Sequence, residues 1–159
     1  MNPRGDRLIN ILWPVGDANL DYLRIRDEDL LFPSEREPYI HSLLSTLVLW
    51  RNPTITFVYP VNQDATITII ARYRGDELRN NYDILGAINS FYDNPISNEE
   101  FRRLLNNERV YQSFFSHDQN RVPTYYYSIL SRNIFTGLIK YDPNTETYYV
   151  QIVTSPNIA

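Results

Sequence analysis

The chain has 159 residues, no cysteine, an aromatic fraction of 14% and a formal net charge of −4. The lack of cysteine excludes disulfides and zinc sites built on thiolates, and the acidic balance argues against a general coat for nucleic acid. The length and the hydrophobic fraction of 43% predict one folded domain spanning residues 1–159 rather than a disordered chain.

Residues 1–36 are predicted to form an irregular N-terminal wrap, because prolines and glycines interrupt them, and only residues 20–25 could form a short strand. The apolar residues before Pro14 are too few and too interrupted for a secretory leader. No apolar run reaches the ~20 residues that span a bilayer. We therefore expect an intracellular protein that is neither secreted nor inserted in a membrane.

A short helix is predicted over residues 38–46, because Pro38 suits the first helical position and apolar residues follow at helical spacing. Residues 54–59 and 66–73 alternate apolar and polar side chains and are rich in β-branched residues, which predicts an antiparallel hairpin. The side chains expected to face inward are Ile55, Phe57, Tyr59, Ile67, Ile69 and Ala71.

Two central helices are predicted next. Asn81 can cap the first helix, which Asn94-Pro95 ends. Ser97 and Glu100 form an S-x-x-E capping box for the second helix, which ends near Asn106-Asn107. The apolar stripe of the first helix consists of Ile84, Leu85, Ile88, Phe91 and Tyr92.

One more helical turn is predicted within residues 108–122, and then a strand over residues 123–130. Residues 134–141 and 147–154 are predicted to form a final hairpin, whose turn carries proline at its second position. The order of these elements predicts an α+β fold. We expect an antiparallel sheet of about five strands, with two central helices packed on one face and an irregular N-terminal wrap.

Residues 82–101 combine a polar–Asp–aliphatic–Leu helix start, an Ala-Ile pair, an aromatic pair and a proline before an acidic helix. Together with residues 132–138 and 148–150, they resemble an uncharacterised family of fungal and giant DNA virus (marseillevirus-type) proteins of unknown function. The resemblance covers residues 80–154 and departs from the fungal pattern at Asn81-Tyr82, where a Thr-Val pair is usual. Its motifs are structural, so it implies no binding or catalytic residues. It does imply a viral protein of the virion, or of the host cytoplasm or nucleus in contact with host proteins.

No motif for nucleophilic catalysis or phosphate binding is present, so we expect no enzyme activity, no cofactor and no metal. A hydrolase that uses His41 or His117 is the weakest hypothesis, because neither histidine has the spacing of a general-base motif. Turns and helix starts explain the adjacent carboxylates more simply than glycosidase chemistry does. These carboxylates are the pairs Asp27/Asp29, Asp76/Glu77 and Glu99/Glu100.

Arginine dominates the 15 basic residues, since Lys140 is the only lysine. Arginine makes bidentate and stacking contacts that lysine cannot make. If folding gathers them, arginines and tyrosines form a surface for single-stranded nucleic acid or for an acidic or phosphorylated partner. A solvated surface with local ion pairs is the simpler alternative. The candidate binding residues are Arg72, Arg74, Arg79, Arg102, Arg103, Arg109, Tyr125, Tyr126 and Tyr127.

Residues 147–153 are aromatic and poor in charge. At an unpaired sheet edge such a strand invites pairing with a second copy, which predicts a homodimer. The expected interface residues are Tyr148, Tyr149, Val150 and Ile152. The leading hypothesis is therefore a structural protein or protein–protein interaction module with an unknown protein partner. Association with nucleic acid is the alternative and is not favoured.

Overall fold

The protein has an α+β fold, and the computed structural model describes residues 11–16, 24–25, 33–116, 118–130 and 133–153. The helices and strands in chain order are β1 (Ile11–Pro14), β2 (Arg24–Ile25), α1 (Pro33–Ser45), β3 (Thr54–Pro60), β4 (Thr68–Arg74), the short 3-10 helix η4 (Gly75–Glu77), α2 (Asn81–Tyr92), α3 (Asn98–Leu105), α4 (Glu108–Phe114), α5 (Tyr125–Ser128), β5 (Ile134–Asp142) and β6 (Thr147–Val153).

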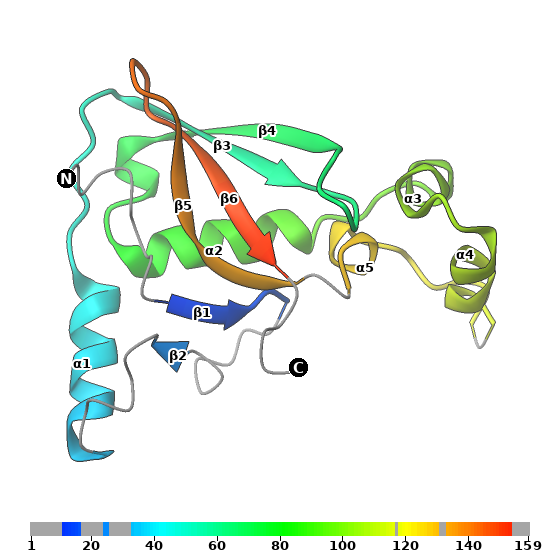
Figure 1. Ribbon diagram of the computed structural model, residues 1–159, viewed down its shortest axis with the longest axis horizontal. Coiled ribbons are helices and arrows are strands. Elements are labelled where there is room, and N and C mark those ends of the chain that lie inside the picture. The colour runs from blue at the N-terminus through cyan, green and yellow to red at the C-terminus, as the bar shows by residue number, and fades with distance from the viewer. Residues whose placement is uncertain (1–10, 17–23, 26–32, 117, 131–132, 154–159) are drawn as a thin grey trace.

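The sheet is mixed rather than purely antiparallel. Its order is β2-β1-β5-β6-β3-β4, with the two-residue β2 beside β1 at one end (Figure 1). The predicted hairpins β3–β4 and β5–β6 are confirmed as antiparallel pairs. The prediction of an all-antiparallel sheet is wrong, because β6 inserts between β5 and β3 and runs parallel to β3. A parallel pair needs a long crossover, and the chain between these two strands includes all the helices from α2 to α5.

Helix α2 packs on one face of this sheet (Figure 1). The predicted apolar stripe is buried at all five positions. The ring of Phe91 stacks on the ring of Tyr59 in β3, with centroids 3.8 Å apart and planes within 4°. The Tyr92 hydroxyl donates a hydrogen bond to the Pro60 carbonyl oxygen at 2.7 Å. These contacts fix α2 against β3.

Helices α3, α4 and α5 form a unit, here called the helical arm, beyond the end of α2 (Figure 1). Helix α3 contacts α4 and α5, so the second central helix does not share the sheet face with α2 as predicted. The arm leaves and re-enters the fold at one point. There Ile96 N–H donates to the Pro123 carbonyl at 2.9 Å, and Tyr125 N–H donates to the Asn94 carbonyl at 3.4 Å.

Two predicted helix starts differ from the observed ones. Helix α1 begins at Pro33 and contains Pro38 inside it, so the preference of proline for the first helical position is met five residues earlier. Asn80, not Asn81, caps α2, because its side chain accepts from Asp83 N–H at 2.8 Å. The Asn81 side chain instead donates to the Leu43 carbonyl at 2.8 Å and ties α2 to α1.

The predicted strand at residues 123–130 is wrong, because residues 125–128 form the single-turn helix α5. A strand would point three consecutive tyrosines to two faces, whereas the helical turn sends them in three directions. Tyr125 stacks on Phe91 at 5.0 Å, Tyr126 lies against Gly16, and Tyr127 packs on Phe114 at 4.8 Å.

The predicted irregular wrap is wrong for residues 11–14, which form β1 and pair with β5, and for residues 33–36, which open α1. Of the short strand predicted at residues 20–25, residues 24–25 form β2, and the rest lies outside the described residues. No helix in the described part of the chain is both long and apolar enough to cross a bilayer.

Candidate binding surface on the helical arm

The arm begins with two short capped helices. Ser97 Oγ accepts a hydrogen bond from Glu100 N–H at 3.1 Å, which confirms Ser97 as the predicted cap of α3. Asn106 adopts a left-handed conformation with φ of 49°, a backbone shape that asparagine tolerates better than most residues. Asn107 then caps α4 by accepting from Val110 N–H at 3.2 Å. Two adjacent asparagines therefore turn the chain and start the next helix.

An aromatic cluster forms the interior of the arm. The rings of Phe101 and Phe114 lie 4.7 Å apart, and Phe114 contacts Tyr127 at 4.8 Å. The rings of Tyr111 and Phe115 lie 5.2 Å apart. Phe101 is 1% exposed within this cluster of rings. The arm therefore has an aromatic interior, and Leu104 of the same helix α3 belongs to the main core.

A groove of about 470 Å³ opens beside α3 and α4. Its walls combine amide and hydroxyl groups with two aromatic rings and one guanidinium. The lining residues are Asn98, Arg102, Tyr111, Gln112, Phe115, Ser116 and Gln119.

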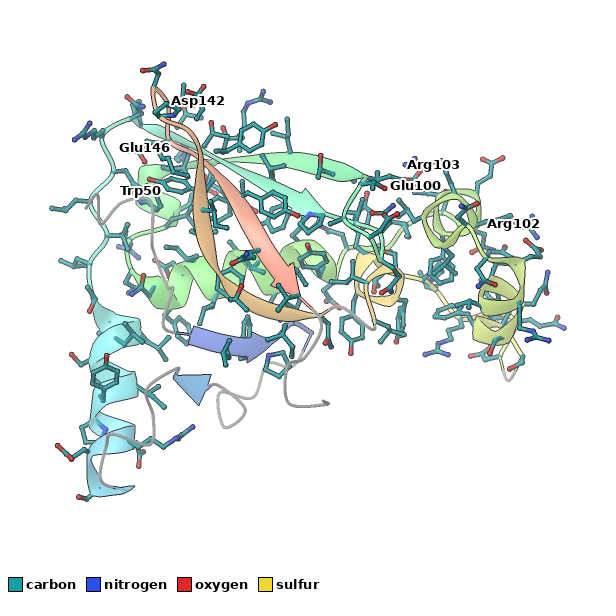
Figure 2. All side chains as sticks on the ribbon, viewed as in Figure 1. Trp50, Glu100, Arg102, Arg103, Asp142 and Glu146 are labelled. Atoms are coloured by element: carbon teal, nitrogen blue, oxygen red, sulfur yellow. The ribbon has the colours of Figure 1, made fainter. Side chains whose placement is uncertain are left out.

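Arg102 lines this groove, and its side chain, labelled on the helical arm in Figure 2, is fixed by two contacts. Its guanidinium lies 4.3 Å from the centre of the Tyr111 ring, within cation–π range. It also donates to a Glu108 carboxylate oxygen at 2.7 Å, and Gln112 donates to the same oxygen at 3.0 Å. The hydrogen bonds from Gln112 and Arg102 lower the pKa of Glu108. The groove thus presents an oriented guanidinium whose charge is locally balanced.

A second cavity of about 320 Å³ lies at the base of the arm. One side of it is fixed by Gly16, whose backbone N–H donates to Asn89 Oδ1 at 3.1 Å. The remaining lining residues are Tyr92, Asp93, Val122, Thr124, Tyr126 and Tyr127. This cavity holds fewer oriented polar groups than the groove, so the groove is the stronger candidate site.

The six candidate arginines do not form one patch. Arg72, Arg74 and Arg79 lie near the start of α2, and the other three lie on the helical arm past its far end (Figure 1). Arg74 pairs with Asp76 at 3.3 Å and with Glu77 at 3.6 Å. The other candidate arginines on the arm, besides Arg102, are Arg103 and Arg109.

The three tyrosines and Arg103 serve mainly to pack the arm. Arg103 forms a two-point ion pair with Glu100 on the same helix. Tyr125, Tyr126 and Tyr127 are all half-buried. Burial and the nearby Glu100 carboxylate raise the pKa of Tyr125, and Arg103 partly opposes this shift. Of the predicted arginine and tyrosine binding residues, Arg102 therefore lines the groove and the others do not.

The predicted dimer interface on β6 is wrong. Strand β6 is central, antiparallel to β5 on one side and parallel to β3 on the other. Tyr148 and Val150 are 0% exposed and Ile152 is 1% exposed, and the β6 strand presents Tyr149 only as a half-buried side chain. An aromatic, uncharged strand is what a doubly paired core position requires, which is the alternative that the edge interpretation overlooked.

The histidines and carboxylate pairs form no reactive cluster in the described residues. His41 is exposed on α1, and His117 and the pair Asp27/Asp29 lie outside the described residues. Asp76 and Glu77 pair with Arg74, and Glu99 opens α3 beside Glu100. Within the described ranges, no three His, Cys, Asp or Glu side chains could hold a metal ion.

Sequence reasoning missed one buried carboxylate. The Glu146 side chain is fully buried, and it accepts hydrogen bonds from Arg51 N–H at 2.9 Å and from the Tyr148 hydroxyl at 2.6 Å. Lys140 Nζ lies 3.8 Å from it. Figure 2 shows Glu146 near Trp50 and Asp142, at the opposite end of the sheet from the arm. Lys140, the only lysine, and Glu146 flank the hairpin turn. This placement of opposite charges was the feature of the sequence that could have indicated the buried carboxylate. Both carboxylate oxygens bind the protein's own donors, so we read the group as structural.

No protein family model, curated protein or solved structure matches the chain. The resemblance to fungal and marseillevirus-type proteins therefore stays a prediction. The class of protein that the fold and the groove define is an α+β domain with a helical arm that carries an open polar groove.

Proposed function

We propose that the protein is a non-enzymatic protein–protein interaction module, which binds an extended segment of a partner protein in the groove of the helical arm. The observation that carries this proposal is the combination of groups in that groove. Amides from Asn98, Gln112 and Gln119 can both donate and accept hydrogen bonds, as a peptide backbone requires. The rings of Tyr111 and Phe115 offer apolar contact to side chains.

Arg102 adds specificity to this chemistry. A guanidinium held over a ring and against a carboxylate loses little conformational entropy when it binds, because it is already oriented. It can donate to a carbonyl or carboxylate oxygen of the partner through the N–H groups that Glu108 does not use. We therefore expect a bound segment with an acidic or amide side chain near Arg102.

The experiment is selection from a library of random peptides displayed on phage, followed by binding of each enriched peptide to the purified protein. The test variant is Ser116→Trp, which fills the groove from an exposed lining position. The matched control is Ser90→Trp, at an exposed position on α2 that lines neither cavity. Enriched peptides should bind the groove variant at least about tenfold more weakly, a loss of ~1.4 kcal/mol, and bind the control unchanged. The proposal fails if no peptide is enriched or if both variants bind alike.

Nucleic acid is the second candidate occupant, because stacked arginine–ring pairs also suit unpaired bases. Besides Arg102 on Tyr111, Arg121 lies 4.1 Å from the centre of the Phe114 ring. Fluorescence anisotropy with a single-stranded oligonucleotide tests this candidate. Binding that weakens steeply with salt and is lost in Ser116→Trp would replace the peptide proposal.

The setting of this function is supported only by the sequence. The resemblance of residues 80–154 to marseillevirus-type proteins supports a role in the virion or in contact with host proteins. A hydrolase is the weakest proposal. Replacing both His41 and His117 by alanine with no loss of any phenotype would leave it without support.

A further inference from the structure

Strand β4 is an edge strand along its full length. It pairs with β3 on one side and stands last in the sheet order, and among the described strands none lies on its other side. The strand at the opposite end of the sheet, β2, has only two residues. A seven-residue edge is long enough to template pairing with another strand.

The hydrogen-bond parity of the β3–β4 ladder identifies the open backbone groups. Val61 N–H donates to the Ile67 carbonyl at 2.9 Å and Gly75 N–H donates to the Pro53 carbonyl at 3.0 Å. These two bonds bracket a regular antiparallel register, so odd-numbered residues of β4 bond to β3 and even-numbered ones face outward.

One end of this edge is closed within the chain. Arg74 N–H points outward, as the parity requires, and donates to Glu77 Oε1 at 2.8 Å. The outward backbone groups that this cap leaves open belong to Thr68, Ile70 and Arg72. Their side chains are also exposed, and the Ile70 side chain in the middle is 55% exposed. The open edge therefore has an apolar residue at its centre.

We propose that a second copy of this chain pairs with this edge, antiparallel, with Ile70 opposite Ile70 of the second copy. In this register Thr68 lies opposite Arg72 of the second copy, so a hydroxyl faces a guanidinium and no like charges meet. Each of these pairs can exchange both backbone hydrogen bonds. The apolar contact at the axis covers the exposed isoleucine.

The alternative registers are less favourable. Centring the pair on Arg72 would oppose two guanidinium groups, which is destabilising. Centring it on Ala71 would place Ile70 opposite a guanidinium and would bring in Arg74, whose outward N–H is already bound by Glu77. Centring it on Ile69 would place Ile70 opposite Thr68 and would lose the contact between the two isoleucines. The edge therefore favours the register centred on Ile70, and this self-complementarity favours a second copy over an unrelated strand.

The first test measures mass by sedimentation over roughly 1–100 µM, where weak dimers dissociate. Ile70→Lys opposes two ammonium groups at the axis and should weaken dimerisation at least about tenfold. Ile70→Pro should do the same, because it removes an outward N–H and no bond of the β3 ladder. The matched control is Ile139→Lys, at a 43% exposed isoleucine on the doubly paired strand β5. It should leave the dimer intact.

The second test is specific to the register and uses the absence of cysteine from the chain. Opposed residues of a hydrogen-bonded pair have Cα atoms about 5.5 Å apart, within disulfide range. Ile70→Cys should therefore form a crosslinked dimer with oxidised glutathione. Thr68→Cys should not, because its copy lies ~13 Å away along the paired strands.

Two outcomes overturn the proposal. One is a monomer over the whole concentration range. The other is a dimer that both Ile70 substitutions leave unchanged or that crosslinks equally well through Thr68→Cys. Because the groove variant Ser116→Trp lies on the helical arm and not on β4, failure of this proposal leaves the peptide-binding proposal standing, and the reverse also holds.

Discussion

At the scale of single residues, Glu146 links two segments that are distant in the sequence. Its carboxylate joins Arg51, just before β3, to Tyr148 in β6, and its carbonyl accepts from Thr56 N–H at 2.8 Å. A buried carboxylate is tolerated because donors satisfy both of its oxygens. This pairing helps to set the parallel register of β3 and β6.

Replacing Glu146 with alanine should lower the free energy of unfolding by about 3–5 kcal/mol, because it leaves buried donors without an acceptor. Glu146→Gln keeps one carbonyl oxygen and should cost less, about 1–3 kcal/mol. Urea unfolding measures both values. A loss below about 1 kcal/mol for Glu146→Ala would show that the hydrogen bonds of the carboxylate contribute little.

Gly16 occupies a position that only glycine fits well. Its φ of 91° disfavours other residues, and a Cβ atom there would lie 2.5 Å from Cε1 of Tyr126. Gly16→Ala should therefore lower the free energy of unfolding by about 1–3 kcal/mol. Gly86→Ala is the matched control, because it lies inside α2 with nothing within 4 Å of the new Cβ. Thermal unfolding should show the control stabilised by about 0.5–1 kcal/mol, and the same sign for both variants would contradict the argument.

At the scale of elements, three stacked rings connect the sheet, α2 and α5. Tyr59 of β3 stacks on Phe91 of α2, and Phe91 stacks on Tyr125 of α5 with planes within 7°. The Tyr59 hydroxyl also lies 2.7 Å from the Tyr73 hydroxyl of β4. This stack of Tyr59, Phe91 and Tyr125 fixes the base of the helical arm against α2 and the sheet.

Buried tyrosines make stability depend on pH in the alkaline range. Burial raises the pKa of Tyr59 and Tyr92 well above the ordinary value of 10.0. The folded state therefore keeps these protons while the unfolded state loses them. The free energy of unfolding should be unaffected by these groups below pH 10 and should fall above it, by up to ~1.4 kcal/mol per pH unit for each tyrosine. Urea unfolding from pH 8 to 11 measures the slope. Tyr59→Phe should make it shallower, and an unchanged slope would exclude Tyr59 as a source.

The elements that the sequence predicted well are those with local signals. Alternation in residues 54–59 specifies β3, and the stripe from Ile84 to Tyr92 specifies α2, because neighbours along the chain share one buried face. The insertion of β6 beside β3 has no such signal, since its partners lie about ninety residues away. The turn at residues 125–128 was likewise missed, because contacts with Phe91 and Phe114 override the strand preference of tyrosine.

The candidate site was also predicted only where local sequence signals were enough. Sequence composition indicated arginine and tyrosine as binding residues, and Arg102 does line the groove. Tyr111, Gln112 and Phe115 were missed, because their convergence depends on the angle between two short helices. That angle is set by Asn106 and Asn107, whose sequence predicts a helix end but not the direction of the next helix.

At the scale of the whole molecule, the helical arm is joined to the rest at its base, where Leu104 of α3 belongs to the main core and Tyr125 stacks on Phe91. Tyr125 N–H donates to the Asn94 carbonyl just after α2, and the hydrogen bond from Ile96 to Pro123 closes the base. The rings of Phe101 and Phe114 pack on each other within the arm. Segments with a small separate core open independently of the global unfolding transition. We therefore expect the arm to open at a lower free energy than the sheet.

Hydrogen exchange followed by mass spectrometry tests this separation. Phe101→Ala removes the central ring of the arm. The expected loss of about 3–5 kcal/mol is larger than the free energy of local opening that so small a unit can have. Amides of α3 and α4 should then lose protection, while those of β3, β5 and β6 keep it. The matched control is Phe57→Ala, which removes a fully buried ring from β3 and should lower protection throughout the chain. Uniform loss of protection in both variants would mean that the arm and the sheet fold as one cooperative unit. The groove would then be a fixed surface of the domain rather than a part of it that opens separately.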